Sequence, residues 1–287
     1  MAPTDLPRRA GVLGKPVAHS LSPVLHRAAF AALGLSGWTY DRFETDAGEL
    51  PGFVDGLGPE WIGLSVTMPG KRAALDHATA VTPRAAAAGA ANTLVRTAEG
   101  WLADCTDVEG VTGALQVAGG YRPAPGDHAV VLGSGGTAAA AVVGLAGLGV
   151  GSAQLVVRNP ARAGETLEAA GRAGLSVDVL TWSEVDFAKL AHEAAVLIST
   201  VPPEAVQPHV AELSRIGSVL DVIYHPWPTP LAEAVAAHGG KLATGLDMLL
   251  HQAFGQVEHF TGRPAPRAEM RTALRAATGE VLPLPIS

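Results

Sequence analysis

The sequence predicts an α/β protein with two α/β domains, the second of them a doubly wound parallel sheet. The chain of 287 residues is long enough for one large or two medium domains. Short apolar runs alternate with helix-like segments along most of it, which is typical of parallel sheets. A glycine-rich turn at 133–136 separates an apolar run from an alanine-rich segment and marks the second domain.

The composition describes a compact globular protein, with 48% hydrophobic and 16% charged residues. The net charge of −7 argues against nucleic acid as a partner. The one cysteine, Cys105, excludes an internal disulfide and a cysteine-based zinc site, and it favours a reducing, cytoplasmic location. The ten histidines include no His-x-x-x-His pair, so no metal site is expected.

Neither a leader peptide nor a membrane span is predicted. Arg8 and Arg9 are not followed by a long apolar run. Residues 129–157 lack charged side chains but contain seven glycines. A strand–loop–helix–strand interpretation accounts for each of these breaks, so we reject a membrane span here.

In the first half of the chain, strands alternate with helices and a hairpin follows. The pair Ser22-Pro23 predicts a helix start with the serine as its cap, and Gly34 predicts the end of that helix. The expected strands are 10–14, 38–43 and 61–67, and the expected hairpin is 94–97 with 101–103. The expected helices are 22–33, 47–55, a stretch ending at 78, 85–91 and one opening within 104–110.

Residues 128–145 predict a strand, a tight turn and a helix. Because glycine has no Cβ, the N–H groups at the helix start can approach a diphosphate, and the helix dipole favours the anion. The pattern G-x-G-G is shorter than the full G-x-G-x-x-G, so a plain strand–turn–helix corner is the alternative for this segment alone. The candidate cofactor-binding residues here are Gly133, Ser134, Gly135, Gly136 and Thr137.

The strand expected at 153–157 ends at Arg158, Asn159 and Arg162. A cofactor with a free 2′-hydroxyl calls for Asp or Glu near this point, and none stands there. A guanidinium fork suits a 2′-phosphate, so the sequence favours NADP over NAD. The alternative is an ordinary solvated helix start, but positive charge is unfavourable at a helix N-terminus without an anion to meet.

Further strands are expected at 177–180, 195–199, 219–223 and 241–243, followed by helices at 246–261 and 268–278. Together with the glycine loop, this alternation of strands and helices predicts a Rossmann-type sheet over 107–245, which would bind NADP. Residues 1–106 and 246–287 would form the substrate-binding catalytic domain. Two such domains imply a cleft for substrate and nicotinamide between them. Thr200, Val201 and Gly245 complete the candidate cofactor residues.

Polar residues in the first half follow apolar runs, so all of them could face one crevice. They are Ser20, Ser22, Thr67, Lys71, Asn92 and Asp107. A lysine with an aspartate makes a proton-handling pair, in which the carboxylate orients the ammonium group. Each residue alone also has a structural explanation, as a helix cap, a turn former or a solvated helix residue. The group of six favours a catalytic site.

Several segments together resemble the shikimate dehydrogenases, from about Ala10 to Thr261. Gly14-Lys-Pro-Val-Ala-His-Ser-Leu-Ser-Pro23 is similar to the substrate-carboxylate loop of that family, and Ser65-Val-Thr-Met-Pro-Gly-Lys71 to its Asn-Val-Thr-x-Pro-x-Lys motif. Ala90-Ala-Asn-Thr-Leu94 and Asp104-Cys-Thr-Asp107 resemble its Ala-Val-Asn-Thr and Asp-Asn-Thr-Asp segments. Gly133-Ser-Gly-Gly136 resembles its nucleotide loop, and Thr244-Gly-Leu-Asp-Met248 with Gln252 its closing segment.

The resemblance implies an oxidoreductase of the shikimate pathway, which leads to chorismate and the aromatic amino acids. The implied reaction is the reversible, NADP-dependent reduction of 3-dehydroshikimate to shikimate. Ser20 and Ser22 would hold the substrate carboxylate with help from Tyr224, and Thr67, Asn92 and Gln252 would hold the ring hydroxyls. Lys71 and Asp107 would be the catalytic pair, with Lys71 as the proton donor.

Four residues depart from the family pattern: Ser65, Gly70, Cys105 and Asp247. They leave open a relative acting on quinate or an aminoshikimate. A methylenetetrahydrofolate dehydrogenase is a second alternative, against which the Ser-x-Ser-Pro loop argues. A silent NADP-binding protein would be expected to have lost Lys71 or Asp107. We expect Cys105 to be a buried filler, the partner to be a small molecule with no membrane involved, and the protein to be a monomer or homodimer.

Overall fold

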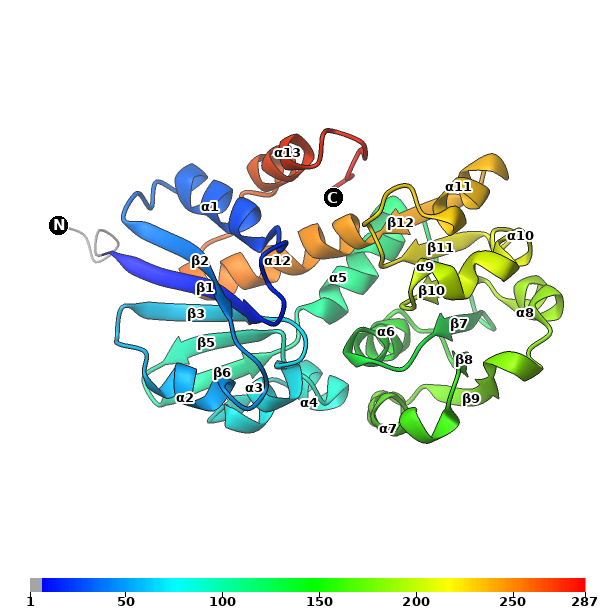
Figure 1. The fold of residues 1–287 in the computed structure, drawn as a ribbon, viewed down its shortest axis with the longest axis horizontal. Coiled ribbons are helices and arrows are strands. Elements are labelled where there is room, and N and C mark those ends of the chain that lie inside the picture. Colours follow the sequence, from blue (N-terminus) through cyan, green and yellow to red (C-terminus); the bar gives the residue numbers. More distant parts are fainter. Residues whose placement is uncertain (1–6, 287) are drawn as a thin grey trace. The chain divides into compact units, whose positions relative to one another are not determined.

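The computed structural model describes residues 7–286, and these form two compact units (Figure 1). Residues 7–106 and 252–286 form the first unit, and residues 107–251 form the second. One division falls between Thr106 and Asp107, and the other falls within helix α12 (Gly245–Thr261), after His251. Residues 1–6 and 287 of the expected domain ranges lie outside the described residues.

The first unit is built on a mixed sheet with the strand order β2-β1-β3-β5-β6-β4 (Figure 1). Its parallel strands are β1 (Arg8–Gly14), β2 (Trp38–Glu44) and β3 (Trp61–Val66). The hairpin of β5 (Thr93–Thr97) and β6 (Gly100–Asp104) follows, with β4 (Ala80–Val81) parallel to β6. The expected strands and hairpin are confirmed. Strand β4 was not predicted, because two residues are too few to show an alternating pattern.

The antiparallel hairpin brings separate motifs to one edge of this sheet. Strand β5 is antiparallel to β3, with Ser65 opposite Thr93, so the residue before β5 lies where β3 ends. Strand β6 is antiparallel to β5, with Asp104 opposite Thr93, so β6 also ends there. The segments around Thr67, Asn92 and Thr106 therefore lie at the same sheet edge.

The helices of the first unit are α1 (Ser22–Ala32), α2 (Leu50–Asp55), α3 (Lys71–His77), α4 (Pro83–Ala88), α13 (Arg267–Ala277) and the second part of α12. The predicted cap of α1 is wrong by one residue. Leu21 occupies the cap position without a side-chain bond, while the Ser22 hydroxyl, already in the helix, accepts from Ser20. Helix α2 begins later than expected, because the Asp46 carboxylate holds the preceding residues in a turn.

Helix α4 begins two residues before the predicted start and ends three residues before the predicted end. The Thr82 hydroxyl accepts from the Ala85 N–H, and Pro83 occupies the first turn, so the cap lies upstream of the alanine run. Gly89 then ends the helix in the left-handed conformation, with φ of 66°.

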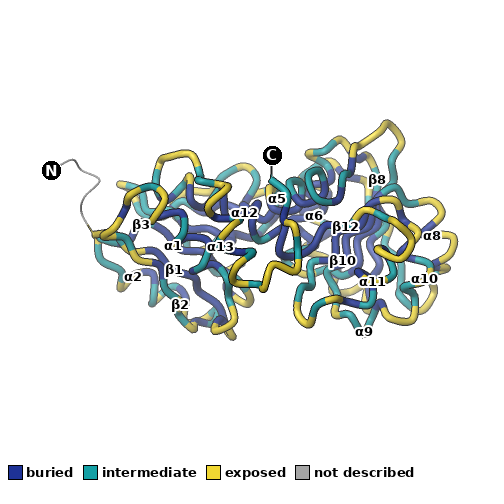
Figure 2. Tube along the Cα trace, turned by 90° about the horizontal axis from the view of Figure 1, so that it is seen from above, coloured by how far each residue is buried: buried dark blue, intermediate teal, exposed yellow. Residues whose placement is uncertain are grey.

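Apolar side chains cover both faces of the first sheet. Figure 2 shows the buried residues of its strands in dark blue. Val12 packs with Phe30 of α1 and Phe260 of α12, while the next residue, Leu13, packs on the opposite face with Leu50 of α2 and Ala74 of α3. This alternation is the period of two that places successive strand side chains on opposite faces.

The second unit is a six-stranded sheet in the order β12-β11-β10-β7-β8-β9, and every described pair in it is parallel. Its strands are β7 (His128–Leu132), β8 (Ser152–Val157), β9 (Ser176–Thr181), β10 (Val196–Ser199), β11 (Ser218–Asp221) and β12 (Lys241–Thr244). The chain order reverses between β7 and β10, so the sheet is doubly wound with its switch point there. This confirms the predicted fold class.

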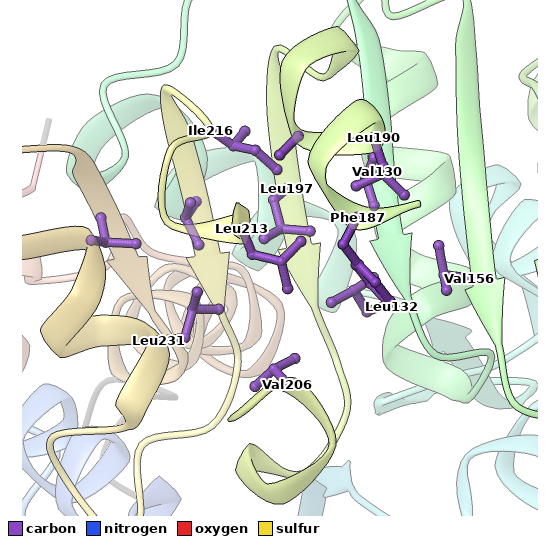
Figure 3. Packing of buried hydrophobic residues seen from close by; sticks show 13 residues of the cluster. Val130, Leu132, Val156, Phe187, Leu190, Leu197, Val206, Leu213, Ile216 and Leu231 are labelled. Atoms are coloured by element: carbon purple, nitrogen blue, oxygen red, sulfur yellow. The ribbon is translucent and has the colours of Figure 1, made fainter. Parts of the chain in front are cut away.

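Helix α5 (Asp107–Gly113) of the second unit continues as a π-helical turn at Ala114–Ala118. The helices that follow in this unit are α6 (Gly136–Gly147), α7 (Gly164–Ala173), α8 (Phe187–Glu193), α9 (Pro203–Val206), α10 (Val210–Leu213) and α11 (Pro230–Ala237). Figure 3 shows one face of the sheet, where Leu132 and Leu197 pack against Phe187, Leu213 and Leu231 of the surrounding helices. Within 7–286, no helix has the length and apolar character needed to cross a bilayer.

Candidate functional site

Two loops at the edge of the first sheet are tied together by main-chain hydrogen bonds. The Lys15 N–H donates to the Met68 carbonyl at 3.0 Å, and the Thr67 N–H donates to the Leu13 carbonyl at 2.8 Å. A Cβ on Gly14 would overlap the Thr67 methyl group, so this approach requires glycine. The loop that carries Ser20 is thus held beside the loop that leads to Lys71.

The predicted carboxylate loop presents two neighbouring hydroxyl groups. The Ser20 hydroxyl donates to the Ser22 hydroxyl at 3.2 Å and accepts from the Ser22 N–H at 3.3 Å. The Arg42 guanidinium holds the Ser20 carbonyl with two bonds of 2.9 and 2.5 Å. A serine hydroxyl has one proton, so Ser20 can donate to a carboxylate once that proton turns from Ser22 toward the ligand.

Asn92 joins three segments that are far apart in the sequence. Its amide nitrogen donates to the Thr106 hydroxyl at 2.9 Å and to Gln252 Oε1 at 3.1 Å. Its amide oxygen accepts from the Thr106 N–H at 2.8 Å. All three side chains are buried. The structure therefore brings the predicted residues Asn92 and Gln252 together.

Lys71 and Asp107 each stand at the start of a helix. Lys71 is the first residue of α3 and is partly buried, and its carbonyl accepts from the Ala91 N–H at 2.9 Å. Asp107 opens α5 and is buried. It directly follows Thr106, so the Asn92 cluster fixes where its main chain begins.

Asp104 anchors the end of β6 through a buried ion pair. Its carboxylate accepts a two-point contact from the Arg84 guanidinium, a 2.6 Å bond from Thr82 and a 2.5 Å bond from His259 Nε2. Burial acts to raise the pKa of Asp104, but the hydrogen bonds from Arg84, His259 and Thr82 outweigh it and hold the pKa well below its usual range. A charged Asp104 thus fixes the strand end from which the 105–107 segment departs.

In the second unit, the glycine loop has the predicted strand–turn–helix form. Gly133 has a φ of 99°, which favours glycine, and a Cβ there would lie 2.5 Å from the Thr200 hydroxyl and 3.0 Å from Val201 Cγ1. Gly135 occupies the cap position of α6 without a side-chain bond. Strands β7 and β10 therefore bring the loop together with Thr200 and Val201 at the switch point of the sheet, where dinucleotides bind.

The end of β8 carries the predicted phosphate-binding arginines. Asn159 accepts from the Ala161 N–H at 3.0 Å and caps the short helical turn Pro160–Arg162. Arg158 and Arg162 are exposed, and neither guanidinium forms an ion pair or hydrogen bond within residues 7–286. Two exposed guanidinium groups without an ion pair within residues 7–286 fit a 2′-phosphate.

Two sequence models of protein families match this chain. The shikimate dehydrogenase substrate binding domain matches residues 12–94, and the shikimate 5′-dehydrogenase C-terminal domain matches residues 245–275. The NADP(+)-dependent shikimate dehydrogenase of Moorella thermoacetica is 38% identical to this chain, over 93% of it and 92% of the relative. The chain belongs to the shikimate dehydrogenase family.

Two solved structures support this assignment. The shikimate dehydrogenase of Mycobacterium tuberculosis is 53% identical, with a TM-score of 0.88 over 94% of this chain and 100% of that one. The Thermus thermophilus enzyme, solved with NADP(H) and shikimate, is 34% identical, with a TM-score of 0.79 over 94% and 99% of the two chains. This shikimate dehydrogenase family member therefore shares its fold with two solved enzymes, one of which was solved with NADP(H) and shikimate.

Local packing accounts for two departures from the family pattern. Asp247 accepts from the Thr244 N–H at 2.8 Å while Thr244 accepts from the Asp247 N–H at 3.3 Å, which is a reciprocal capping box at the start of α12. A Cβ on Gly70 would lie 2.9 Å from Leu50 and 3.0 Å from Val66, so a larger residue there would displace both side chains.

The remaining predicted residues lie in or beside these elements. Tyr224 follows β11 and is partly buried, and burial raises the pKa of its hydroxyl. A Cβ on Gly245 would lie 2.7 Å from the Tyr224 ring, so glycine permits this close approach. Within the described part of the chain, no cluster of three potential metal ligands occurs.

The expected burial of Cys105 is confirmed. Cys105 lies between the end of β6 at Asp104 and the start of α5 at Asp107. Cys105 is 1% exposed.

Two residues that contact Asn92, Thr106 and Gln256, were not predicted as site residues. Thr106 lies inside the Asp104–Asp107 motif, so its place in that motif could have identified it. Gln256 lies four residues after Gln252, and helical spacing places the two glutamines on one face of α12.

Proposed function

We propose that the protein catalyses the reversible, NADP-dependent reduction of 3-dehydroshikimate to shikimate. The Asn92–Thr106–Gln252 cluster is the observation that carries this proposal, because it joins three of the family motifs within the first unit. The first unit would bind the substrate and the second unit would bind NADP.

The roles of the substrate-binding residues follow from the chemistry of a small polyhydroxy acid. The hydroxyl groups of Ser20 and Ser22, with that of Tyr224, would hold the carboxylate. Thr67, Asn92 and Gln252 would hold the ring hydroxyls, because a hydroxyl or an amide can both donate and accept.

Lys71 would give a proton to the carbonyl oxygen of 3-dehydroshikimate, and Asp107 would orient its ammonium group. NADPH, when bound, supplies the hydride that adds to the carbonyl carbon. The products are then shikimate and NADP, and in the reverse direction Lys71 takes the proton of the substrate hydroxyl. The partly buried position of Lys71 at the start of α3 supports this role.

The proposed NADP site consists of the loop at Gly133–Thr137 with Thr200, Val201 and Gly245. The α6 N-terminus would meet the diphosphate, while Arg158, Asn159 and Arg162 would hold the 2′-phosphate. The positive φ of Gly133 and the exposed, unpaired arginines support this assignment.

The test is an assay of NADPH oxidation with 3-dehydroshikimate and of NADP reduction with shikimate. Parallel reactions with quinate, an aminoshikimate and methylenetetrahydrofolate separate the alternatives. We expect the highest kcat/KM with the shikimate pair. A higher kcat/KM with another substrate would reassign the enzyme, and no turnover with any of them would contradict dehydrogenase activity.

The proposal includes a cytoplasmic enzyme that acts as a monomer or homodimer. The single cysteine in the sequence supports a reducing compartment. Light scattering on the purified protein would measure the oligomeric state.

A further inference from the structure

A chain of buried hydrogen bonds leads to Asn92 and involves three residues with no role in the reaction described above. Tyr40 on β2 donates to the Ser65 hydroxyl on β3 at 2.6 Å. Ser65 donates to Gln256 Oε1 on α12 at 2.7 Å. The exposed fractions of the three residues are 0%, 4% and 1%.

The far end of this chain is Asn92. Gln256 Nε2 donates to the Asn92 main-chain carbonyl at 3.1 Å and to the Thr93 hydroxyl at 2.9 Å. Thr93 in turn donates to the Asn92 side-chain oxygen at 2.9 Å. Gln256 therefore contacts the Asn92 backbone directly and the Asn92 side chain indirectly, through Thr93.

The Asn92 carbonyl sets the direction of every bond in the chain. A carbonyl oxygen can only accept, so the NH₂ group of Gln256 must face it. Gln256 Oε1 then faces Ser65, which must donate to it, and the Ser65 oxygen is left to accept from Tyr40. Burial raises the pKa of the Tyr40 hydroxyl, so Tyr40 keeps the proton that it donates.

The same direction continues into the proposed site. With its oxygen committed to Thr93 and to the Thr106 N–H, the Asn92 amide must turn its nitrogen toward Gln252 Oε1. The orientation of both proposed hydroxyl-binding amides is thus linked to the Ser65–Gln256 bond. Buried polar networks that are fully satisfied in this way rigidify and specify a single arrangement.

We propose that Ser65 and Gln256 are positioning residues for shikimate, which hold the amides of Asn92 and Gln252 in the orientation that binds the ring hydroxyls. This inference rests on the proposed function. It also gives a role to Ser65, which stands where the family motif has Asn.

The decisive comparison is Ser65→Val with Ser65→Thr. The two variants have the same shape, so both add the same bulk and only Thr keeps the hydroxyl. We expect Ser65→Val to raise the KM for shikimate by about tenfold, the effect of one lost hydrogen bond at ~1.4 kcal/mol, and to leave the KM for NADP unchanged. Ser65→Thr should stay within about threefold of the parent.

Gln256→Glu provides the second test, because its shape is retained while its carboxylate cannot donate to the Asn92 carbonyl. Gln256→Met removes the polar group at similar volume. Both should raise the KM for shikimate by at least about tenfold, again without a change in the KM for NADP. These variants carry the test if Ser65→Val does not fold.

Ser218 provides a matched control in the second unit. It is a buried strand serine, on β11, whose hydroxyl donates to the Gly119 carbonyl at 3.0 Å. Ser218→Val should lower the melting temperature and leave the KM for shikimate unchanged. The same result for Ser65→Val and for the folded Gln256 variants would overturn the proposal, because a merely structural role lowers the folded fraction but does not change a KM. A parent enzyme without shikimate activity would instead contradict the proposed function.

Discussion

The main-chain N–H of Thr106 donates a 2.8 Å hydrogen bond to the Asn92 side-chain oxygen, and the Asn92 amide donates a 2.9 Å bond back to the Thr106 hydroxyl. This reciprocal pair locks the Ala90–Leu94 motif to the Asp104–Asp107 motif. Consecutive Cα atoms are about 3.8 Å apart, so the pair also fixes the start of Asp107. A proposed substrate-binding residue and a proposed catalytic residue are thereby held by one pair of hydrogen bonds.

Lys71→Ala should lower kcat by on the order of 10²–10⁴-fold with a small change in the KM for shikimate. Loss of a general acid removes an interaction that matters in the transition state more than in the bound substrate. Steady-state assays in both directions measure this. Asp107→Asn should act in the same direction but less severely.

Lys189→Ala is the control for Lys71→Ala, since Lys189 is exposed on α8 and pairs only loosely with Glu193 at 3.9 Å. It should keep the parent kcat. Near-normal turnover of Lys71→Ala would place the proton donor elsewhere.

The unmodified enzyme should prefer NADP strongly over NAD, and Arg158→Asp should reduce that preference. A carboxylate at residue 158 repels the 2′-phosphate and can accept from a bare ribose hydroxyl. We expect the KM for NADP to rise on the order of tenfold to a hundredfold, with a smaller change for NAD. Arg172→Asp on α7 is the control and should retain the parent preference. Equal kcat/KM values for the two cofactors in the parent would contradict the assignment.

Strand positions were predictable because buried strands form short apolar runs between glycine and proline breaks. The expected strand Ala129–Leu132 falls within β7, and the expected strand Ala195–Ser199 matches β10 apart from its first residue. The two lie on either side of the switch point. Helix starts were less predictable, because a hydroxyl can cap a helix only if no other side chain in the fold binds it. Ser22 bonds with Ser20 and Tyr40 instead of capping α1.

The candidate site was predictable only where a motif carried it. Asn92 and Gln252 were predicted from motifs, and in the structure Asn92 Nδ2 lies 3.1 Å from Gln252 Oε1. Gln256 lies in no motif, and its proposed role depends on contacts with Ser65 and Thr93, which are more than 160 residues away in the sequence. Such long-range side-chain contacts leave no local pattern.

His26 should make the protein less stable below about pH 6.5. Its ring is buried and stacks on Tyr40 with centroids 4.1 Å apart. Burial lowers the pKa of His26 from 6.5 to about 4, against the opposing effect of its hydrogen bond to the Ser22 carbonyl. The fold therefore favours the neutral ring, and stability that is complete above about pH 6.5 is lost as the pH falls toward 4.

This loss should be roughly 2 kcal/mol between about pH 7 and pH 5. Urea unfolding of the parent and of His26→Phe at both pH values measures it, and the variant should show a smaller pH dependence. His192→Gln, at an exposed position on α8, should behave like the parent. Equal pH dependence in His26→Phe and the parent would assign the effect to other groups.

Cys105→Asn should keep activity within about tenfold of the parent, an energy change near that of one hydrogen bond. The thiol is buried, and hydride transfer to a ketone needs no thiol. The family motif has Asn at this position. The main-chain N–H of Cys105 donates to Asp104 at 2.8 Å, and that bond does not depend on the side chain.

Thiol-blocking reagents should therefore react slowly with Cys105, and shikimate should slow them further. Cys105→Ala serves as a second variant, because it removes the thiol without adding volume to a closely packed position. It should remain active even if the larger Asn lowers the melting temperature. A Cys105→Ala enzyme that is folded but as inactive as Lys71→Ala would assign the thiol a direct part in the chemistry, since a buried filler can affect stability without abolishing turnover.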